Sequence, residues 1–570
     1  MRRFRRHDKR SVTELNGFWD FAFLGDVDLD SIDVGKIDFV DRMAVPGCFD
    51  STPDYAGWRG LTAYRTHVLL PDSALHRLVF DGVNHWCRVY VDDQKMCDHV
   101  GGHTRFSVDI ADHQPGETAI IVLVDNRFDY ERCPLHLDHM DWYHHGGIAR
   151  PVELHQLGEL WINSLVVTTE DWQERRIAVT VSYGSVSGPC EIDFILTFNG
   201  EEILKEKVEL VEGQGEIRRV LELPGANLWS PETPNLHLIH VCLGEDDIRE
   251  RIGIRQMKVE GRRIMINGEP IILRGLCRHE LHPDFGCGLP DAQIVADAQI
   301  LRKIGCNVVR GVHYPQDPRF LDLCDEMGIC VLSESIGWQN TEEQINDPHF
   351  IKAQLNNIDE MVAVSINHPS VITWGILNEG DSAKEGSRKG YETLLGRLRE
   401  LDASRPVTYS TCHPEDDKCL DLCDIVSLNW FPGWYLREID EIPEELDRIV
   451  GVLDSVGCAN KPILISEIAA GAVAGFRDWY QDRWTEDYQA KLLGVALRHL
   501  LFDRDRVCGV CIWQFADCRS FERIRGILTR PRGYNSKGVV DEYRRPKLAF
   551  DVVKRLYQEL GRATSREAEG

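Results

Sequence analysis

The sequence predicts a multidomain protein built from a jelly-roll β-sandwich, an immunoglobulin-like β-sandwich and a (β/α)8 TIM barrel. Two observations lead to this prediction. Short segments of alternating apolar and polar residues run up to about Ile254, and from Arg255 onward apolar strands are separated by helix-length amphipathic runs. We place the domains at residues 1–157, 158–254 and 255–570.

The two sandwiches are predicted from strands with a period of two. Residues 87–91 alternate between apolar and polar side chains, and Gly, Asp and Pro clusters interrupt the first domain at short intervals. Residues 177–183 and 192–198 alternate in the same way, which is typical of a second and smaller sandwich.

The barrel is predicted from eight apolar segments, each followed by polar or aromatic residues. Helices between such strands are the signature of βα units, and eight units in one domain predict a closed parallel barrel. The active face of such a barrel lies at the carboxyl ends of its strands. The predicted strands are residues 270–277, 306–313, 330–335, 371–379, 406–411, 425–431, 462–468 and 507–517.

Charge and composition exclude several classes of partner. The chain has 65 Lys and Arg against 92 Asp and Glu, a net charge of −27 that argues against nucleic acid. No apolar run approaches the roughly 20 residues that span a membrane, and no apolar segment follows the basic start, so we expect a cytoplasmic protein without a membrane partner. The 18 cysteines are scattered, several within apolar strands, and we interpret them as small buried side chains.

Two predicted strands end on a glutamate. One runs from Val371 to Glu379 and the other from Pro462 to Glu467. Either residue alone is as compatible with an ordinary salt bridge as with catalysis. Together they predict paired carboxylate chemistry, because cleavage of a glycosidic bond needs an acid for the leaving group and a second carboxylate for the anomeric centre.

The order of domains and several motifs resemble glycoside hydrolase family 2. The resemblance covers nearly the whole chain. It implies that Glu379 is the acid/base, that Glu467 is the nucleophile, and that the anomeric configuration is retained. It also leads us to expect a protonated Glu379 beside an ionised Glu467, since one carboxylate charge raises the pKa of its neighbour. The motifs are Arg278-His279-Glu280, Val312-His313-Tyr314-Pro315, Asn378-Glu379 and Ser466-Glu467.

Within that family the β-glucuronidases are the most similar members. The loop after the eighth strand holds Asn535-Ser-Lys537, and the resemblance implies that this Asn-x-Lys pattern grips the carboxylate of a uronic acid. A chain with a net charge of −27 repels such a sugar unless a cation is aimed at it. Lys537 would supply the charge, Asn535 an amide donor, and Arg532 a second cation. An isolated Asn-x-Lys is usually a solvated loop.

The resemblance also assigns further residues to the substrate site. Asp141 corresponds to an aspartate that the first domain directs toward the sugar hydroxyls, and Trp513 to a tryptophan beneath the sugar ring. The alternatives are a surface acid for Asp141 and core positions for Trp513 and the histidines. The remaining predicted contacts are His279, His313, Asn378, Asn429 and Tyr435.

One position departs from the β-glucuronidase pattern. Phe431 stands where those enzymes carry a tyrosine two residues beyond the asparagine, so a hydroxyl near the nucleophile is missing unless Tyr409 or Tyr435 replaces it. A β-galacturonidase, whose substrate differs only at C4, is therefore the main alternative. The segment between Ser335 and Ile351 is also short, which indicates an open site.

The sequence thus predicts an exo-acting retaining β-glucuronidase that releases terminal β-linked uronic acids from glycans or conjugates. We expect no cofactor, no metal in the chemistry, a β-uronide substrate and a homo-oligomer. A β-galactosidase and a catalytically inactive carbohydrate-binding protein are further alternatives. A flavin or nucleotide enzyme is disfavoured, since no Gly-rich phosphate loop follows an early strand.

Overall fold

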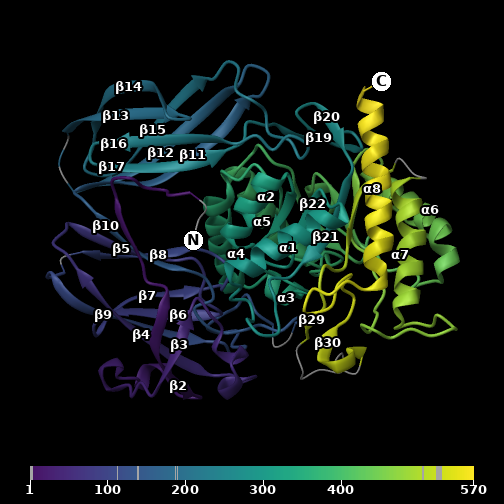
Figure 1. Ribbon diagram of the computed structural model, residues 1–570, viewed down its shortest axis with the longest axis horizontal. Coiled ribbons are helices and arrows are strands. Elements are labelled where there is room, and N and C mark those ends of the chain that lie inside the picture. Colours follow the sequence, from purple (N-terminus) through teal and green to yellow (C-terminus); the bar gives the residue numbers. More distant parts are fainter. Residues whose placement is uncertain are drawn as a thin grey trace.

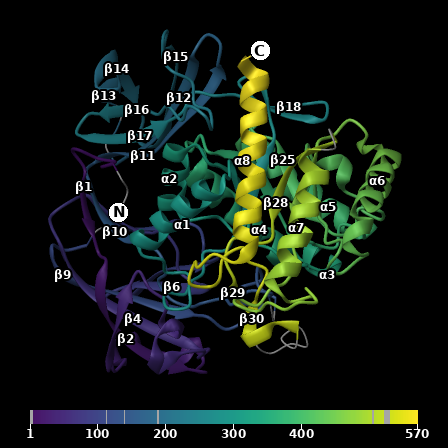
Figure 2. The ribbon, with the colours of Figure 1, turned by 45° about the vertical axis from the view of Figure 1, so that its right-hand side comes forward.

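Two β-sandwiches lie on the same side of a closed β/α barrel in the computed structural model (Figure 1 and Figure 2). The structure describes residues 4–111, 113–137, 140–186, 188, 190–502, 506–520 and 529–569. The predicted fold class is confirmed, because two sandwiches precede an eight-stranded parallel barrel.

The first sandwich packs a four-stranded sheet on a six-stranded sheet. The inward faces share one apolar core that includes Trp19, Phe21 and Tyr64, each at most 1% exposed. In order across the four-stranded sheet the strands are β1 (Ser11–Glu14), β10 (Val152–Leu157), β5 (Leu75–Phe80) and β8 (Phe106–Ala111). Across the six-stranded sheet they are β3 (Asp41–Val45), β2 (Gly17–Gly25), β4 (Leu61–Leu70), β9 (Gly116–Asp125), β6 (Trp86–Val91) and β7 (Gln94–Val100).

The second sandwich is smaller and packs three strands on four. Its alternating residues close a separate core. The strands are β11 (Leu160–Asp171), β12 (Arg176–Ser185) and β15 (Gly213–Glu222) in one sheet, and β14 (Glu201–Leu210), β13 (Cys190–Phe198), β16 (His237–Leu243) and β17 (Asp246–Ile252) in the other. A three-stranded sheet leads into the barrel, with β18 (Met257–Glu260), β19 (Arg263–Ile266) and β20 (Glu269–Ile271).

All eight predicted barrel strands are confirmed, in the predicted order. Their side chains are buried because helices cover the outside of the barrel and side chains fill its interior. The strands are β21 (Leu273–Arg278), β22 (Val308–Gly311), β23 (Cys330–Glu334), β24 (Val371–Ile376), β25 (Val407–Thr411), β26 (Val426–Asn429), β27 (Ile463–Glu467) and β28 (Val507–Ile512).

Helices surround the barrel, and α8 runs along its outside against α7 (Figure 1). The first two helices stop at Gly305 and Gly328, whose φ angles of 100° and 68° suit glycine because it has no Cβ. The helices are α1 (Asp291–Ile304), α2 (Pro318–Met327), α3 (Glu342–Ile345), α4 (Pro348–Ser365), α5 (Arg388–Leu401), α6 (Ile442–Leu453), α7 (Glu486–Leu501) and α8 (Leu548–Glu569). A two-stranded sheet, β29 (Cys518–Arg519) and β30 (Tyr534–Asn535), follows the last barrel strand.

Buried polar contacts fix the first sandwich to the barrel. Arg150 donates to Glu280 at 2.8 Å and to the Pro315 carbonyl at 2.8 Å. The rings of His103 and Tyr314 stack with centroids 3.9 Å apart. Because Pro315 follows the second barrel strand, these contacts hold the first sandwich at the carboxyl ends of the barrel strands.

The described helices include none with the length and apolarity needed to cross a membrane. The 18 cysteines all lie in the described part of the chain, and none of them is in a disulfide. Most are buried, in agreement with their interpretation as packed thiols.

Candidate active site

Glu379 and Glu467 both lie at the carboxyl ends of barrel strands. Glu467 is the last residue of β27 and is 4% exposed. Glu379 follows β24 on a tight turn in which Leu377 and Glu379 have φ angles of 28° and 53°. Such angles are uncommon for residues with a Cβ and are typical of functional turns. The Glu379 amide donates to the Ser410 carbonyl at 2.9 Å, which holds the turn.

Asn429 orients the Glu379 carboxylate. Its Nδ2 donates to Glu379 Oε1 at 2.8 Å and to Asn378 Oδ1 at 3.0 Å, and its Oδ1 accepts from Ser466 Oγ at 2.9 Å. Gln339 Nε2 donates to the other carboxylate oxygen at 3.0 Å. The strand ends of β24, β26 and β27 therefore meet in one hydrogen-bonded network.

Arg310 is shared between two buried carboxylates. It donates from Nη1 to Glu467 Oε1 at 2.8 Å, and from Nη2 to Glu334 Oε2 at 3.0 Å and Asn378 Oδ1 at 2.8 Å. One guanidinium charge does not offset the burial of two carboxylates. Burial therefore raises the pKa of Glu334 to about 6, and burial together with the Glu379 charge raises the pKa of Glu467 to about 8 despite Arg310.

These values contradict the expected ionised Glu467. Burial in a shell with a single shared cation favours the protonated form of Glu467. One carboxylate does raise the pKa of its neighbour, as predicted from the sequence, but here the Glu379 charge raises the pKa of Glu467.

Aromatic rings from both domains line the same mouth. His313 Nδ1 forms a hydrogen bond of 2.8 Å with Glu334 Oε1. The His313 ring stacks on Trp513 with ring centroids 5.2 Å apart. Trp142, from the first sandwich, has its ring centroid 5.0 Å from His279 and 5.3 Å from His313. The structure therefore brings His279, His313 and Trp513 together, and Trp142 is a contact that the sequence analysis missed.

A charged cluster forms between the first sandwich and the loop after β28. Arg530 donates from Nε and Nη2 to the two Asp141 oxygens at 2.8 Å each, and Asn535 Nδ2 donates to Asp141 Oδ2 at 2.8 Å. Lys537 is 3% exposed, with its Nζ 5.3 Å from the centre of the Tyr435 ring. We call these five residues the cationic cluster.

Two pKa shifts report the charge of this cluster. Burial favours the neutral form of Asp141, yet Arg530 and Lys537 hold the pKa of its carboxyl below the usual range. Tyr435 is 58% exposed, and Lys537 and Arg530 lower the pKa of its hydroxyl. Both cations therefore face this hydroxyl.

Hydrogen bonds to its carbonyl groups hold the backbone of the Lys537 loop in place. The Lys537 carbonyl accepts from Gln489 Nε2 at 3.2 Å and from the Gln514 amide at 3.1 Å. Lys547 donates to the Ser536 carbonyl at 3.1 Å. Because Gln514 follows Trp513 directly, these bonds tie the loop to the strand end that carries the tryptophan.

Arg530, and not Arg532, is the arginine of this loop that joins the cluster. Arg532 donates to Glu542 at 2.9 Å, and its side chain is 47% exposed. Arg532 has a φ of 60°, and the turn around it sends the two arginines in different directions. The predicted Arg532 contact is therefore replaced by Arg530.

The two tyrosines considered as replacements for the hydroxyl missing at Phe431 have other partners. Tyr409 donates to Asp417 at 2.6 Å, whereas Tyr435 belongs to the cationic cluster. The Phe431 ring packs edge-on against Tyr435 with centroids 5.5 Å apart. In the described part of the chain we find no tyrosine hydroxyl bonded to Glu467.

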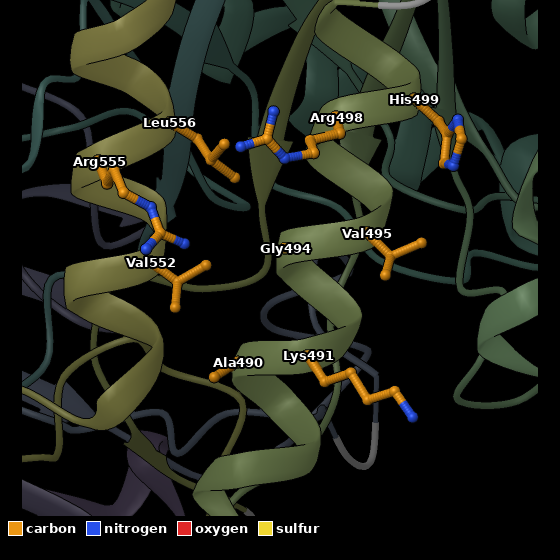
Figure 3. Close-up of a pocket in the computed structure, with 9 residues that line it drawn as sticks. All are labelled: Ala490, Lys491, Gly494, Val495, Arg498, His499, Val552, Arg555 and Leu556. Atoms are coloured by element: carbon orange, nitrogen blue, oxygen red, sulfur yellow. The ribbon is translucent and has the colours of Figure 1, made fainter.

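A groove on the outside of the barrel lies between α7 and α8 (Figure 3). It contains none of the residues above. Its lining is Ala490, Lys491, Gly494, Val495, Arg498, His499, Val552, Arg555 and Leu556. The candidate site is therefore the barrel mouth and not this groove.

Comparison with protein families gives three consecutive matches. Residues 48–158 match "Glycosyl hydrolases family 2, sugar binding domain", residues 161–255 match "Glycosyl hydrolases family 2", and residues 257–561 match "Glycosyl hydrolases family 2, TIM barrel domain".

Individual relatives cover most of the chain. A β-glucuronidase of Paenibacillus borealis is 30% identical over 518 residues, 84% of each chain. Among solved structures, a β-galacturonidase of Eisenbergiella tayi bound to galacturonate is 35% identical, with a TM-score of 0.92 and coverage of 98% of this chain and 99% of the other. A β-D-glucuronidase of Dictyoglomus thermophilum is 27% identical, with a TM-score of 0.83 and 97% of each chain covered.

Proposed function

The chain belongs to glycosyl hydrolase family 2, and we propose that it is an exo-acting retaining β-hexuronidase with a preference for β-galacturonides. It would release terminal β-linked uronic acids from glycans or conjugates. As a member of this family it is a glycoside hydrolase of the uronidase type.

The cationic cluster carries the proposal. Arg530 and Lys537 bring two positive charges and Asp141 one negative charge, so the cluster has one net positive charge. A uronic acid differs from a neutral hexose by one carboxylate. A single buried positive charge in a chain of net charge −27 supports recognition of that group by charge-assisted hydrogen bonds.

Contacts around the mouth support a common site for this cluster and the glutamates. Tyr435 packs on Phe431, which lies two residues beyond Asn429, and Asn429 holds Glu379. The Asp141 charge also acts on His279, whose ring meets that of Trp513. A sugar on Trp513 would thus have its carboxylate toward Lys537 and its anomeric carbon toward the glutamates.

In the proposed first step the single proton of the glutamate pair moves from Glu467 to Glu379 when substrate binds. Ionised Glu467 then attacks the anomeric carbon while Glu379 donates this proton to the glycosidic oxygen. A bond forms between the anomeric carbon and a Glu467 oxygen, and the bond to the aglycone oxygen breaks. In the second step Glu379 accepts a proton from water, the water oxygen bonds to the anomeric carbon, and Glu467 is released.

Two buried nitrogen atoms without partners among the described residues support recognition of the sugar hydroxyls. Asn378 Nδ2 and His279 Nε2 are buried and have no hydrogen-bond partner among the described residues. Such groups are rare in folded proteins and cost stability until a partner binds. Both belong to the mouth described above, so a sugar hydroxyl is the partner we propose for each.

Two observations favour the galacturonide epimer. Phe431 lacks the hydroxyl that the β-glucuronidase pattern carries, and the similar E. tayi structure is described as a β-galacturonidase. The sequence predicts a β-glucuronidase, and the similarity to the P. borealis β-glucuronidase supports glucuronide as the second candidate substrate. We also propose a cytoplasmic homo-oligomer, to be tested by light scattering and cell fractionation.

The test compares nitrophenyl β-galacturonide, β-glucuronide and β-galactoside on one preparation, with the product anomer followed by proton NMR. We expect the galacturonide to have the highest kcat/KM and the β-anomer to form first. If the galactoside has the highest kcat/KM, the cationic cluster does not select for a sugar carboxylate. If the α-anomer forms first, the mechanism is not retaining. An equal rate in Glu467→Gln would assign the activity to a contaminant.

A further inference from the structure

Three histidines from separate segments of the first sandwich converge behind the sugar-facing loop. His85 lies just before β6, and His136 and His144 flank the loop that carries Asp141. Their ring centroids are 4.5, 5.1 and 4.8 Å apart, and one nitrogen of each ring lies within 4.8 Å of the other two. Three imidazoles at this spacing match the ligand number of a transition-metal site.

The imidazole nitrogens of this trio have almost no other partner. The three residues are 0%, 1% and 2% exposed. Among the residues that the structure describes, both nitrogens of His85, both nitrogens of His144 and Nε2 of His136 are buried and have no hydrogen-bond partner. Buried polar atoms are nearly always paired, so five unpaired nitrogens in one cluster indicate a missing partner. A metal ion would use one lone pair from each ring.

The remaining nitrogen of His136 is held by a cysteine. His136 Nδ1 lies 2.9 Å from Cys133 Sγ, and the His136 amide donates to the Cys133 carbonyl at 3.1 Å. A proton on Nδ1, donated to sulfur, leaves the lone pair of Nε2 for a metal. Metal-bound histidines commonly have their second nitrogen fixed in this way, which sets the tautomer and the ring orientation.

The surroundings of the trio indicate which metals it would take. Phe128 lies against His85 and His144, with centroids 5.7 and 5.9 Å away, and Arg59 donates to the His144 carbonyl at 2.5 Å. The trio includes no carboxylate, and an arginine is nearby. Calcium and magnesium need anionic oxygen ligands, whereas zinc and similar ions bind neutral imidazoles.

Each of the other clusters of potential ligands in the described part of the chain contains carboxylates that are paired with a basic side chain. Asp246 is paired with Arg10, and Asp325 receives the His368 ring at 2.6 Å and the Ser370 amide at 3.0 Å. In the same cluster Asp322 Oδ2 has no partner among the described residues, but Asp322 is already paired with Arg251, which donates to its Oδ1 at 3.0 Å. The histidine trio differs because none of its ligand atoms has a hydrogen-bond partner among the described residues.

We propose that His85, His136 and His144 bind one zinc-class divalent ion, and that Cys133 orients the His136 ring for this role. The bound ion would fix the loop that carries Asp141. The connection to the sugar site is direct. The ring of Trp142 lies 4.9 Å from His144 and 5.0 Å from His279 of the barrel. An ion on His144 would therefore hold both Trp142 and its neighbour Asp141 in place.

The test measures the metal content of the full-length chain, expressed without a polyhistidine tag. We expect one zinc per chain by mass spectrometry, loss of thermal stability on chelation, and recovery with Zn²⁺ but not with Mg²⁺ or Ca²⁺. Replacement by Co²⁺ should give the visible d–d bands of a tetrahedral nitrogen site. His85→Gln and His144→Gln should abolish uptake, and Cys133→Ser should weaken affinity about 10- to 100-fold.

His76→Gln is the matched control. His76 lies on β5 of the same sandwich and also has a buried nitrogen without a partner, but it is outside the trio. This variant should keep its metal. Substoichiometric metal in the wild type after Zn²⁺ loading, or full uptake by the two histidine variants, would overturn the site. If those variants do not fold, the wild-type stoichiometry and the Co²⁺ spectrum still decide, and neither depends on the substrate.

Discussion

Replacement of Lys537 by methionine removes one charge at nearly constant side-chain length. The cationic cluster then changes from one net positive charge to none. A hydrogen bond to a charged group contributes about 1.5 to 3 kcal/mol, which corresponds to a loss of about 10- to 150-fold in kcat/KM for a uronide. We expect most of the loss in KM, because the sugar carboxylate is present in both the ground state and the transition state.

The assay compares the variant with the wild type on nitrophenyl β-galacturonide, β-glucuronide and β-galactoside. The galactoside has no carboxylate, so its kcat/KM should change by less than about threefold. Lys491→Met is the matched control, since Lys491 is exposed on α7 in the outer groove (Figure 3) and should leave all three rates unchanged. Melting temperatures measured alongside show whether each variant is folded.

One result would refute the reasoning. If Lys537→Met lowers the rates on all three substrates by the same factor, Lys537 supports the fold and does not recognise the carboxylate. Its buried position makes this a real alternative. The deciding measurement is therefore whether Lys537→Met lowers kcat/KM on the uronides more than on the galactoside.

Three further predictions concern the same mouth. Arg530→Ala should lower kcat/KM on uronides at least about tenfold, because it leaves the partly buried Asp141 carboxylate without its cation. Arg532→Ala, which breaks a partly exposed ion pair, should lower kcat/KM less than about twofold, and equal losses would contradict this assignment. With phenyl β-galacturonide, whose leaving group needs protonation, kcat/KM should fall above pH 8, where the glutamate pair loses its last proton from Glu467; a flat profile to pH 10 would contradict this. Phe431→Tyr should raise the ratio of glucuronide to galacturonide activity, measured as relative kcat/KM, and an unchanged ratio would remove Phe431 from the explanation of epimer choice.

The fold could be predicted because burial determines the sequence pattern. Barrel strands are covered on both faces, so they appear as apolar runs, and the eight runs correspond to the eight strands. The same logic located Glu379 and Glu467, since a carboxylate directly after an apolar run falls at a strand end. Neither step required the identity of a distant neighbour.

Some site residues were not predicted, because their roles depend on contacts with residues that are distant in the sequence. Arg310 and Glu334 lie within predicted strands, and a charge inside an apolar strand could have signalled a buried ion pair. Trp142 and Arg530 gave no comparable signal. Arg530 and Arg532 are two residues apart in one loop, and only the backbone turn between them decides which one reaches Asp141.

The histidine trio illustrates the same limit. Cys133 and His136 are close in sequence, but His85 comes from a different strand region, and only the fold brings it to the others. A pair of ligands at short spacing is weak evidence for a metal without its distant partners. The unpaired nitrogens, which indicate that a ligand is missing, are visible only in three dimensions.

Unlike the glutamate pair, the cationic cluster includes a residue of the first sandwich. Glu379, Glu467 and their hydrogen-bonding partners all belong to the barrel. The cluster instead needs Asp141 of the first sandwich to hold Arg530 beside Lys537. The packing of the sandwich on the barrel therefore sets the net charge of the proposed uronate site. If the proposed function is correct, a substitution in the Asp141 loop should change the choice among sugars while leaving Glu379 and Glu467 in place.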